Sequence, residues 1–267
     1  MLVPALALAW SEPANNGTAS RVTAIGGHLL SDRPRVHYIP EFLTADEVSL
    51  VLGALPPQPW QPVKADYADC DTADGKTEQN VSTAKLQLTA PLQPIVHKLS
   101  TLLGANVESI TELPALRYAP GHTGLDVHHD RFHSDGGMPD ATLLIYLTRV
   151  PPGASQTIFP DVSLQISPQP GAMLAWMNVD AQHAVDPTAA HGISALGVDA
   201  PMDRIVIQIP VNLLPPNSGL EAPRPCPPVR APDILLPDWP AMSPLDRPCA
   251  GGGPPFDAYV CPHSVRG

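Results

Sequence analysis

Short apolar runs separated by turn-forming residues fill the chain between about residues 113 and 212. In order, the runs read ALRYAP, LDVHHD, ATLLIYLTRV, QTIFP, VSLQIS, AMLAWMN and DRIVIQIPVN. Many short strands with turn signals between them are typical of an all-β sandwich or barrel. We therefore predict a β core over this part of the chain.

Two helices are predicted ahead of the β core. The first begins at Thr44, which forms a capping box with Glu47, because each side chain can bond to the backbone of the other residue. The second is predicted over residues 91–103, where apolar residues fall on one helical face. These residues are Leu92, Ile95, Val96, Leu99, Leu102 and Leu103. We expect both helices to pack on one sheet of the core.

Less regular segments surround these elements. The run VHYIPEFL, residues 36–43, is strand-like, whereas residues 58–83 are polar and are expected to be irregular. Three parts of the chain follow from the pattern. We expect residues 1–33 to be a leader or flexible arm, residues 34–213 to form one folded domain, and residues 214–267 to be a proline-rich tail.

Composition excludes some function classes and leaves others open. The formal net charge is −11 and no basic stripe is present, so we expect no nucleic-acid partner. No apolar run reaches the roughly 20 residues of a membrane helix. The apolar start MLVPALALAW has no positive residues ahead of it, so a secretory or endoplasmic-reticulum location and a cytoplasmic one both stay open.

The four cysteines do not indicate a metal site. Cys70, Cys226, Cys249 and Cys261 include no Cys-x-x-Cys pair, which makes a zinc knuckle improbable. Neither their pairing nor their redox state can be assigned from the sequence.

The segment LDVHHDRFH, residues 125–133, carries the first candidate metal ligands. Side chains two apart on a strand point the same way, so His128 and Asp130 would lie side by side and His129 opposite. An imidazole and a carboxylate in this arrangement are two of the three ligands of the facial triad that binds non-haem Fe(II). The triplet alone fits a polar strand end with surface histidines better than a metal site.

Two histidines further along the chain qualify as the third ligand. His183 lies in DAQHAVD and His191 lies in AAHGISA. Beyond both, Arg204 opens the apolar run DRIVIQIPVN and shares a strand face with Val206 and Gln208. Its planar guanidinium suits a carboxylate; the alternative is a solvated strand end paired with Asp203 or a neighbour.

At this point the sequence resembles the prolyl 4-hydroxylase-like group of Fe(II)/2-oxoglutarate dioxygenases, over roughly residues 36–212. The similar segments, in order, are PEFLTADEV, RYAPGHTGLDVHHDRF, ATLLIYLTRVPPGASQTIFP, SPQPGAMLAWMN and DPTAAHG. Their common order is far more specific than any one motif. The glycine after His191 fits the family's distal histidine segment, so the resemblance selects His191 over His183.

The resemblance implies a mainly β fold with flanking helices, built on a double-stranded β-helix (jelly-roll) core. It also implies that His128, Asp130 and His191 bind Fe(II) and that Arg204 binds the distal carboxylate of 2-oxoglutarate. Tyr118 and Tyr146 lie where family members place hydroxyl donors to that carboxylate, and Thr157 is a weaker candidate for the same site. Trp176 is expected in the core, whereas His37 and His122 are expected to be exposed or locally bonded.

The implied activity is hydroxylation of a peptidyl proline, with O2 as second cosubstrate and decarboxylation of 2-oxoglutarate to succinate. Ascorbate is a candidate cofactor, and the implied partner is a proline-containing peptide or protein. The segments 58–83 and 133–140 are candidate substrate lids.

Departures from the family pattern put the substrate in doubt. Leu125 stands where the family often has an aromatic residue, and arginine replaces the lysine of the collagen-type members. Oxygenation of another side chain or of a small molecule therefore stays open, as does a catalytically silent jelly-roll that binds a partner. Zinc hydrolysis on the same ligands is disfavoured by the proposed role of Arg204.

Overall fold

The computed structural model describes residues 25–64, 77–103, 111–130, 139–180, 182 and 184–211. The proline-rich tail, the four cysteines, His183 and the 133–138 part of the second candidate lid lie outside these residues. None of the helices in the described part of the chain is long and apolar enough to cross a membrane.

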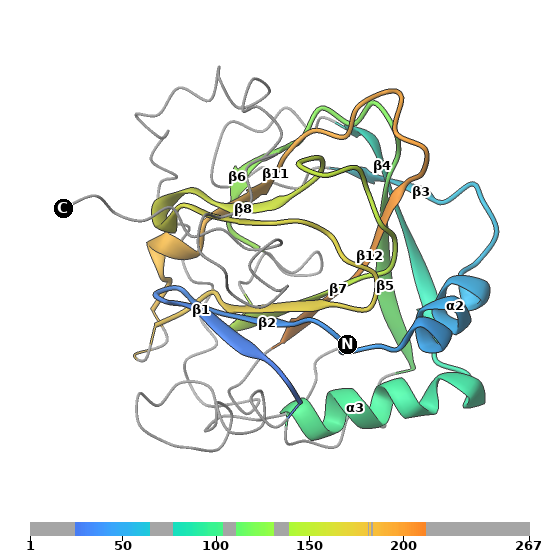
Figure 1. Ribbon diagram of the computed structural model, residues 1–267, viewed down its shortest axis with the longest axis horizontal. Helices are drawn as coiled ribbons and strands as arrows, with labels where there is room; N and C mark the ends of the chain where they lie inside the picture. Colours follow the sequence, from blue (N-terminus) through green and yellow to red (C-terminus); the bar gives the residue numbers. More distant parts are fainter. Residues whose placement is uncertain are drawn as a thin grey trace, which may run out of the picture.

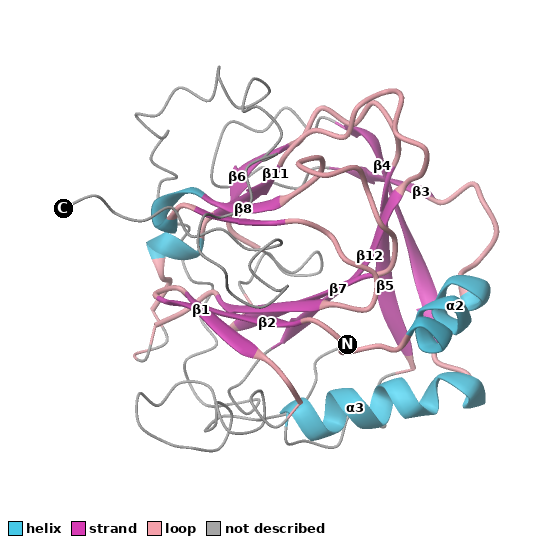
Figure 2. Ribbon diagram, viewed as in Figure 1, coloured by secondary structure: helices cyan, strands magenta, loops and turns pink. Residues whose placement is uncertain are grey.

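Two antiparallel sheets form the core (Figures 1 and 2). The larger has the strand order β1-β2-β10-β7-β12-β5-β4-β3, and the smaller has the order β6-β11-β8-β9. The strands are β1 (His28–Asp32), β2 (Arg35–Ile39), β3 (Gln61–Lys64), β4 (Thr77–Gln87), β5 (Glu112–Tyr118), β6 (Leu125–His128), β7 (Ala141–Tyr146), β8 (Thr157–Phe159), β9 (Leu164–Ile166), β10 (Met173–Met177), β11 (His191–Ile193) and β12 (Arg204–Val211).

The order of the last eight strands is that of a jelly-roll. From β5 onward the chain alternates between the two sheets, except that β8 and β9 follow each other in the smaller one: β5, β7, β10 and β12 lie in the larger sheet and β6, β8, β9 and β11 in the smaller. A double-sheet jelly-roll is one way in which an antiparallel all-β fold manages its exposed sheet edges. The predicted fold class, mainly β with a double-stranded β-helix core and flanking helices, is confirmed.

Both predicted helices are present and cover one face of the larger sheet. α2 (Ala45–Ala54) begins with the capping box between Thr44 and Glu47, and α3 (Gln93–Leu103) follows a short 3-10 helix, η1 (Ala90–Leu92). Lys98 of α3 donates to Glu47 at 2.5 Å and to the Phe42 carbonyl at 3.1 Å, which joins the two helices. Figure 1 shows α3 running along the outside of the larger sheet.

Alternate residues of the same strands build two apolar layers. Leu143, Ile145, Ile207 and Ile209 pack with the helices, and we call this the helix-covered layer. The inter-sheet layer lies between the two sheets. It contains Val36, Tyr38, Leu144, Tyr146, Phe159, Leu164, Ile166, Leu174, Trp176, Ile193 and Val206. The predicted alternation along β12 is therefore confirmed, and so is the core position of Trp176.

Four strands depart from the sequence-based expectations. β3 and β4 occupy much of the segment expected to be irregular, and β1 falls within the residues grouped with the N-terminal arm. β11 was not among the expected strands. Three of these strands have no apolar pattern in the sequence. β3 and β4 lie at one end of the larger sheet and β1 at the other, and a strand there need not have an apolar side chain face. Residues 65–76, between β3 and β4, lie outside the described part.

Candidate metal centre

Three potential metal ligands meet at the edge of the inter-sheet layer. His128 is the last residue of β6, Asp130 lies two residues beyond it, and His191 opens β11 directly opposite His128 in the sheet register. One ligand atom from each lies within 4.8 Å of the other two, and the His191 Nε2 to Asp130 Oδ2 distance is 3.7 Å. Bonds of about 2 Å to one ion place such atoms about 3 Å apart, so a modest closure of the side chains suffices.

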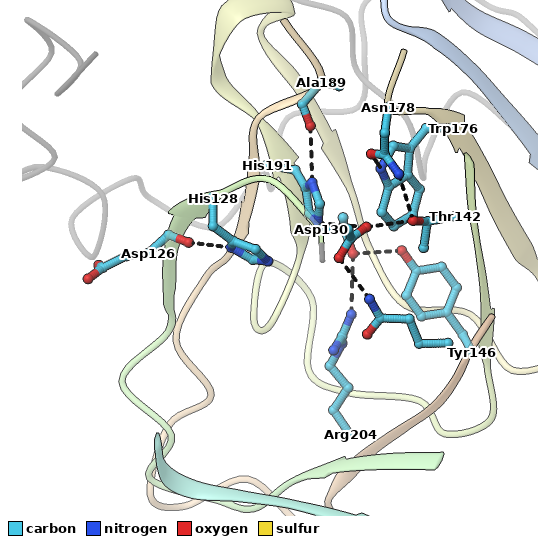
Figure 3. A network of polar contacts seen from close by, with 12 residues as sticks. Asp126, His128, Asp130, Thr142, Tyr146, Trp176, Asn178, Ala189, His191 and Arg204 are labelled. Atoms are coloured by element: carbon cyan, nitrogen blue, oxygen red, sulfur yellow. Dashed lines mark hydrogen bonds and ion pairs between the residues drawn. The ribbon is translucent and has the colours of Figure 1, made fainter. Parts of the chain in front are cut away.

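Backbone carbonyls orient both imidazoles. The Nδ1 atom of His128 lies 2.7 Å from the Asp126 carbonyl, and that of His191 lies 3.1 Å from the Ala189 carbonyl (Figure 3). A carbonyl only accepts, so each Nδ1 carries the proton and each Nε2 keeps its lone pair. The tautomer that a metal requires is therefore fixed by the backbone at both positions.

A chain of buried hydrogen bonds holds the carboxylate of Asp130. The Thr142 hydroxyl donates to Oδ2 at 2.6 Å, and the Gln208 amide donates to Oδ1 at 2.9 Å. Behind Thr142, the Asn178 amide donates to its hydroxyl at 3.0 Å, and the Trp176 indole donates to the Asn178 carbonyl, also at 3.0 Å (Figure 3). The position of Asp130 is thus set by β7, β10 and β12 together.

Aromatic side chains keep His191 neutral by burying it. The ring centroid of Trp176 lies 4.7 Å from that of His191, and that of Phe159 lies 5.5 Å away. Burial lowers the pKa of His191 to about 4, although the charge of Asp130 opposes the shift. A neutral imidazole at neutral pH is the form that binds a metal ion.

Arg204 lies in the same layer, fully buried at 0% exposure. Its Nη2 atom donates to the Thr157 hydroxyl at 3.2 Å, whereas Nε and Nη1 have no hydrogen-bond partner among the described residues. The guanidinium carbon lies 4.6 Å from the ring centre of Tyr118 and 5.6 Å from that of Tyr146. This burial excludes the alternative of a solvated arginine, and Asp203 pairs with Arg117 at 2.6 Å.

A buried cation of this kind calls for an anion. Taking a charge out of water is costly unless it is paired, and guanidinium nitrogens that lack an acceptor can donate to the oxygens of a carboxylate. Tyr146 adds a hydroxyl 2.8 Å from that of Thr157, and burial raises its pKa, so it stays protonated. The residues present therefore fit a small carboxylate beside Arg204.

Several residues of the site were not expected from the sequence. Thr142, Asn178 and Gln208 hold Asp130, and only Gln208 had a signal, since strand alternation places it on the face of Arg204. His37 and His122, expected to be exposed or locally bonded, are only 4% and 1% exposed. His122 does have a local bond, because the Gly124 amide donates to its Nδ1.

Comparison with known proteins adds little beyond the fold. No protein-family model and no curated protein matches this sequence. Among solved structures, the chain is similar to a collagen prolyl hydroxylase of Paramecium Bursaria Chlorella virus-1 in complex with 2OG (18% identity, covering 65% of this chain and 92% of that one, TM-score 0.42). It is also similar to a Pseudomonas putida prolyl-4-hydroxylase (14% identity, 72% and 94%, TM-score 0.43). These similarities are too low to carry a conclusion about activity.

Proposed function

We propose that this protein is an Fe(II)- and 2-oxoglutarate-dependent dioxygenase that hydroxylates a peptidyl proline. One observation supports the proposal above all others. A cluster of two histidines and one aspartate lies in the same inter-sheet layer as a fully buried arginine, two of whose nitrogens have no acceptor among the described residues. A metal site alone does not need that arginine, and a structural arginine does not need the metal ligands.

The ligand set favours Fe(II). Two imidazoles and one carboxylate on one side of an ion leave the other positions open, which is the pattern of non-haem Fe(II) oxygenases. His128, Asp130 and His191 would hold the ion. Iron and 2-oxoglutarate, when bound, supply the oxidising chemistry together with O2. The chain contributes position, two fixed tautomers and an apolar wall that excludes water.

The cation and its neighbours favour 2-oxoglutarate as the cosubstrate. Arg204 would pair with the distal carboxylate, and the hydroxyls of Tyr118 and Tyr146 are proposed as further donors. Thr157 links Tyr146 to Arg204 through its hydroxyl. These contacts would fix the direction in which the dicarboxylate enters, with its keto acid end toward the metal ligands.

The proline substrate rests on the sequence resemblance alone, which is an argument by analogy. A proline-containing peptide or protein is the proposed partner, and ascorbate is a candidate for keeping the metal reduced. No nucleic-acid partner is proposed, given the acidic chain.

The test is succinate formation by the full chain with Fe(II), 2-oxoglutarate and a panel of proline-containing peptides. We expect peptide-stimulated succinate formation that is lost in His128→Ala, while this variant stays folded by circular dichroism. Turnover stimulated only by free metabolites or by peptides without proline would refute the proline substrate. Absence of any Fe(II)-dependent succinate would instead indicate a silent binding module.

Arg204→Gln separates the cosubstrate from the metal. Removing one partner of a buried charge pair costs about 2–5 kcal/mol, so we expect 2-oxoglutarate affinity to fall at least about 30-fold. The affinity for Mn(II), used as a redox-stable substitute for iron, should change little. Unaltered 2-oxoglutarate affinity in this variant would contradict the assigned role of Arg204.

A further inference from the structure

A second buried histidine has an unused hydrogen-bond donor. His122 is 1% exposed, and the Gly124 amide donates to its Nδ1 atom at 3.2 Å. Because Nδ1 accepts, the proton of the neutral ring is on Nε2. That Nε2–H has no hydrogen-bond partner among the described residues.

The backbone fixes His122 in place. Its amide donates to the Ala119 carbonyl at 3.1 Å, and its carbonyl accepts from the Leu196 amide at 2.8 Å. The ring therefore sits on a turn that is tied to the segment before β12. A donor held in this way cannot easily swing away to find another partner.

His122 and Arg204 contact the same tyrosine. The His122 ring meets Tyr118 edge-on with centroids 5.1 Å apart, while the Arg204 guanidinium carbon lies 4.6 Å from the centre of the same ring. Burial, followed by the nearby charge of Arg204, lowers the pKa of His122 to about 4. The ring is therefore a neutral donor at neutral pH.

Among the described residues, Nε and Nη1 of Arg204 and Nε2 of His122 are three buried donor nitrogens without an acceptor, and both side chains contact Tyr118. Each unsatisfied buried donor is costly, and all three have the same polarity, so they cannot satisfy one another. An acceptor with several lone pairs, placed between the two side chains, would satisfy more than one of them. A carboxylate has this chemistry, with about four lone-pair sites on two oxygens.

We infer that His122 is a second anchor for the distal carboxylate of 2-oxoglutarate, donating its Nε2–H alongside Arg204. This inference rests on the proposed function. The positive charge of Arg204 then balances the negative charge of the distal carboxylate, and the neutral His122 adds a hydrogen bond without adding a second positive charge. His122 becomes a residue that selects a dicarboxylate over a 2-oxo acid with an apolar tail.

The test uses a matched pair of variants in the full chain. In His122→Asn the side-chain oxygen can still accept from the Gly124 amide, but nothing replaces the Nε2–H. In His122→Gln the longer amide can put an N–H near the Nε2 position. Calorimetry of the Mn(II)-loaded protein without O2 measures the affinity for 2-oxoglutarate and for 2-oxopentanoate, which lacks the distal carboxylate.

We expect His122→Asn to bind 2-oxoglutarate about tenfold more weakly, as for loss of one hydrogen bond to a charged group. Its affinity for 2-oxopentanoate should be unchanged, and His122→Gln should recover most of the affinity for 2-oxoglutarate. Equal weakening for both ligands would show a merely structural role and overturn the inference. So would wild-type affinity in His122→Asn.

The measurements distinguish failure of the proposed function from failure of the inference about His122. If the wild-type protein binds no 2-oxoglutarate, both fall. If it binds and Arg204→Gln abolishes binding while His122→Asn does not weaken it, only the role of His122 is wrong. Should His122→Asn not fold, His122→Gln and His122→Met, of similar length with and without the N–H, provide the same comparison.

Discussion

The helix-covered layer and the inter-sheet layer are made from neighbouring residues of the same strands, yet they differ in what they bury. On β12, Ile207 and Ile209 face the helices, whereas Arg204 and Gln208 face the other sheet. On β7, Leu143 packs with the helices, and Thr142 bonds to Asp130 on the opposite side. Strand alternation thus places the polar groups of the site on the inter-sheet face and apolar side chains on the helix-covered face of a single sheet.

The difference indicates that one layer stabilises the fold and the other binds ligands. The helix-covered layer gains stability from apolar area removed from water. The inter-sheet layer contains a buried carboxylate, buried imidazoles and an arginine without a full set of partners, which are costly until ligands bind. We therefore expect changes in the first layer to alter stability and changes in the second to alter binding.

Leu143→Ala should have the largest effect on stability. Leu143 is fully buried in the helix-covered layer, and truncation of a buried leucine costs about 3 kcal/mol through lost burial and the remaining cavity. Urea unfolding should show this loss, while Mn(II) affinity of the folded variant stays within about twofold. A parallel fall in metal affinity would mean that the two layers are not separable.

His37 is the exception in the helix-covered layer, and it should make stability depend on pH. Burial, helped by the charge of Arg35, lowers its pKa from 6.5 to about 4. As the pH falls, His37 therefore binds its proton in the unfolded chain before it does so in the folded protein. The free energy of unfolding is unaffected by His37 above pH 6.5 and decreases as the pH drops from 6.5 toward 4. From pH 8 to pH 5 this amounts to about 2 kcal/mol.

Urea unfolding at both pH values in the wild type and in His37→Gln measures this contribution. The variant should lose about 2 kcal/mol less than the wild type between the two pH values, because glutamine does not titrate. Identical pH dependence would show that other groups, among them the buried His122 and His191, account for the acid sensitivity.

Thr142→Val tests the inter-sheet layer with almost no change of shape. Thr142 is 0% exposed and donates to Asp130 while accepting from Asn178. Loss of a residue that supports a metal ligand costs about 10–100-fold in metal affinity. Mn(II) titration should show at least a tenfold loss. Thr142→Ser, which keeps the hydroxyl, should retain most of the affinity, and equal losses in both variants would point to packing instead.

Strand and helix periodicity predicted the fold well, and the site less completely. The apolar runs predicted seven strands of the jelly-roll and both helices, because burial on one face leaves a clear pattern. β3 and β4 were missed, since polar strands at the end of a sheet leave no such pattern. His128, Asp130 and His191 lie together as the resemblance implied, but their metal binding stays a prediction.

Apart from Gln208, the supporting residues could not have been found from the sequence. Asn178 and Thr142 meet only because β7 and β10 pair in one register, and that register depends on the whole sheet. The burial of His122 likewise depends on the segment around Leu196, more than seventy residues away along the chain. Contacts of this kind are properties of the folded state and leave no local pattern.

Thr44→Ala should have the smallest effect and belongs wholly to the helix-covered side. The Glu47 amide donates to the Thr44 hydroxyl at 3.2 Å, and the Thr44 amide donates to the Glu47 carboxylate at 2.7 Å. Removing the hydroxyl leaves one amide of the first turn to water, which costs about 1 kcal/mol. Thr44→Ser keeps the cap and serves as the control. Because α2 lies on the outer face of the larger sheet, neither variant should change Mn(II) or 2-oxoglutarate affinity, and a change in either would show that the helices communicate with the metal centre through the sheet.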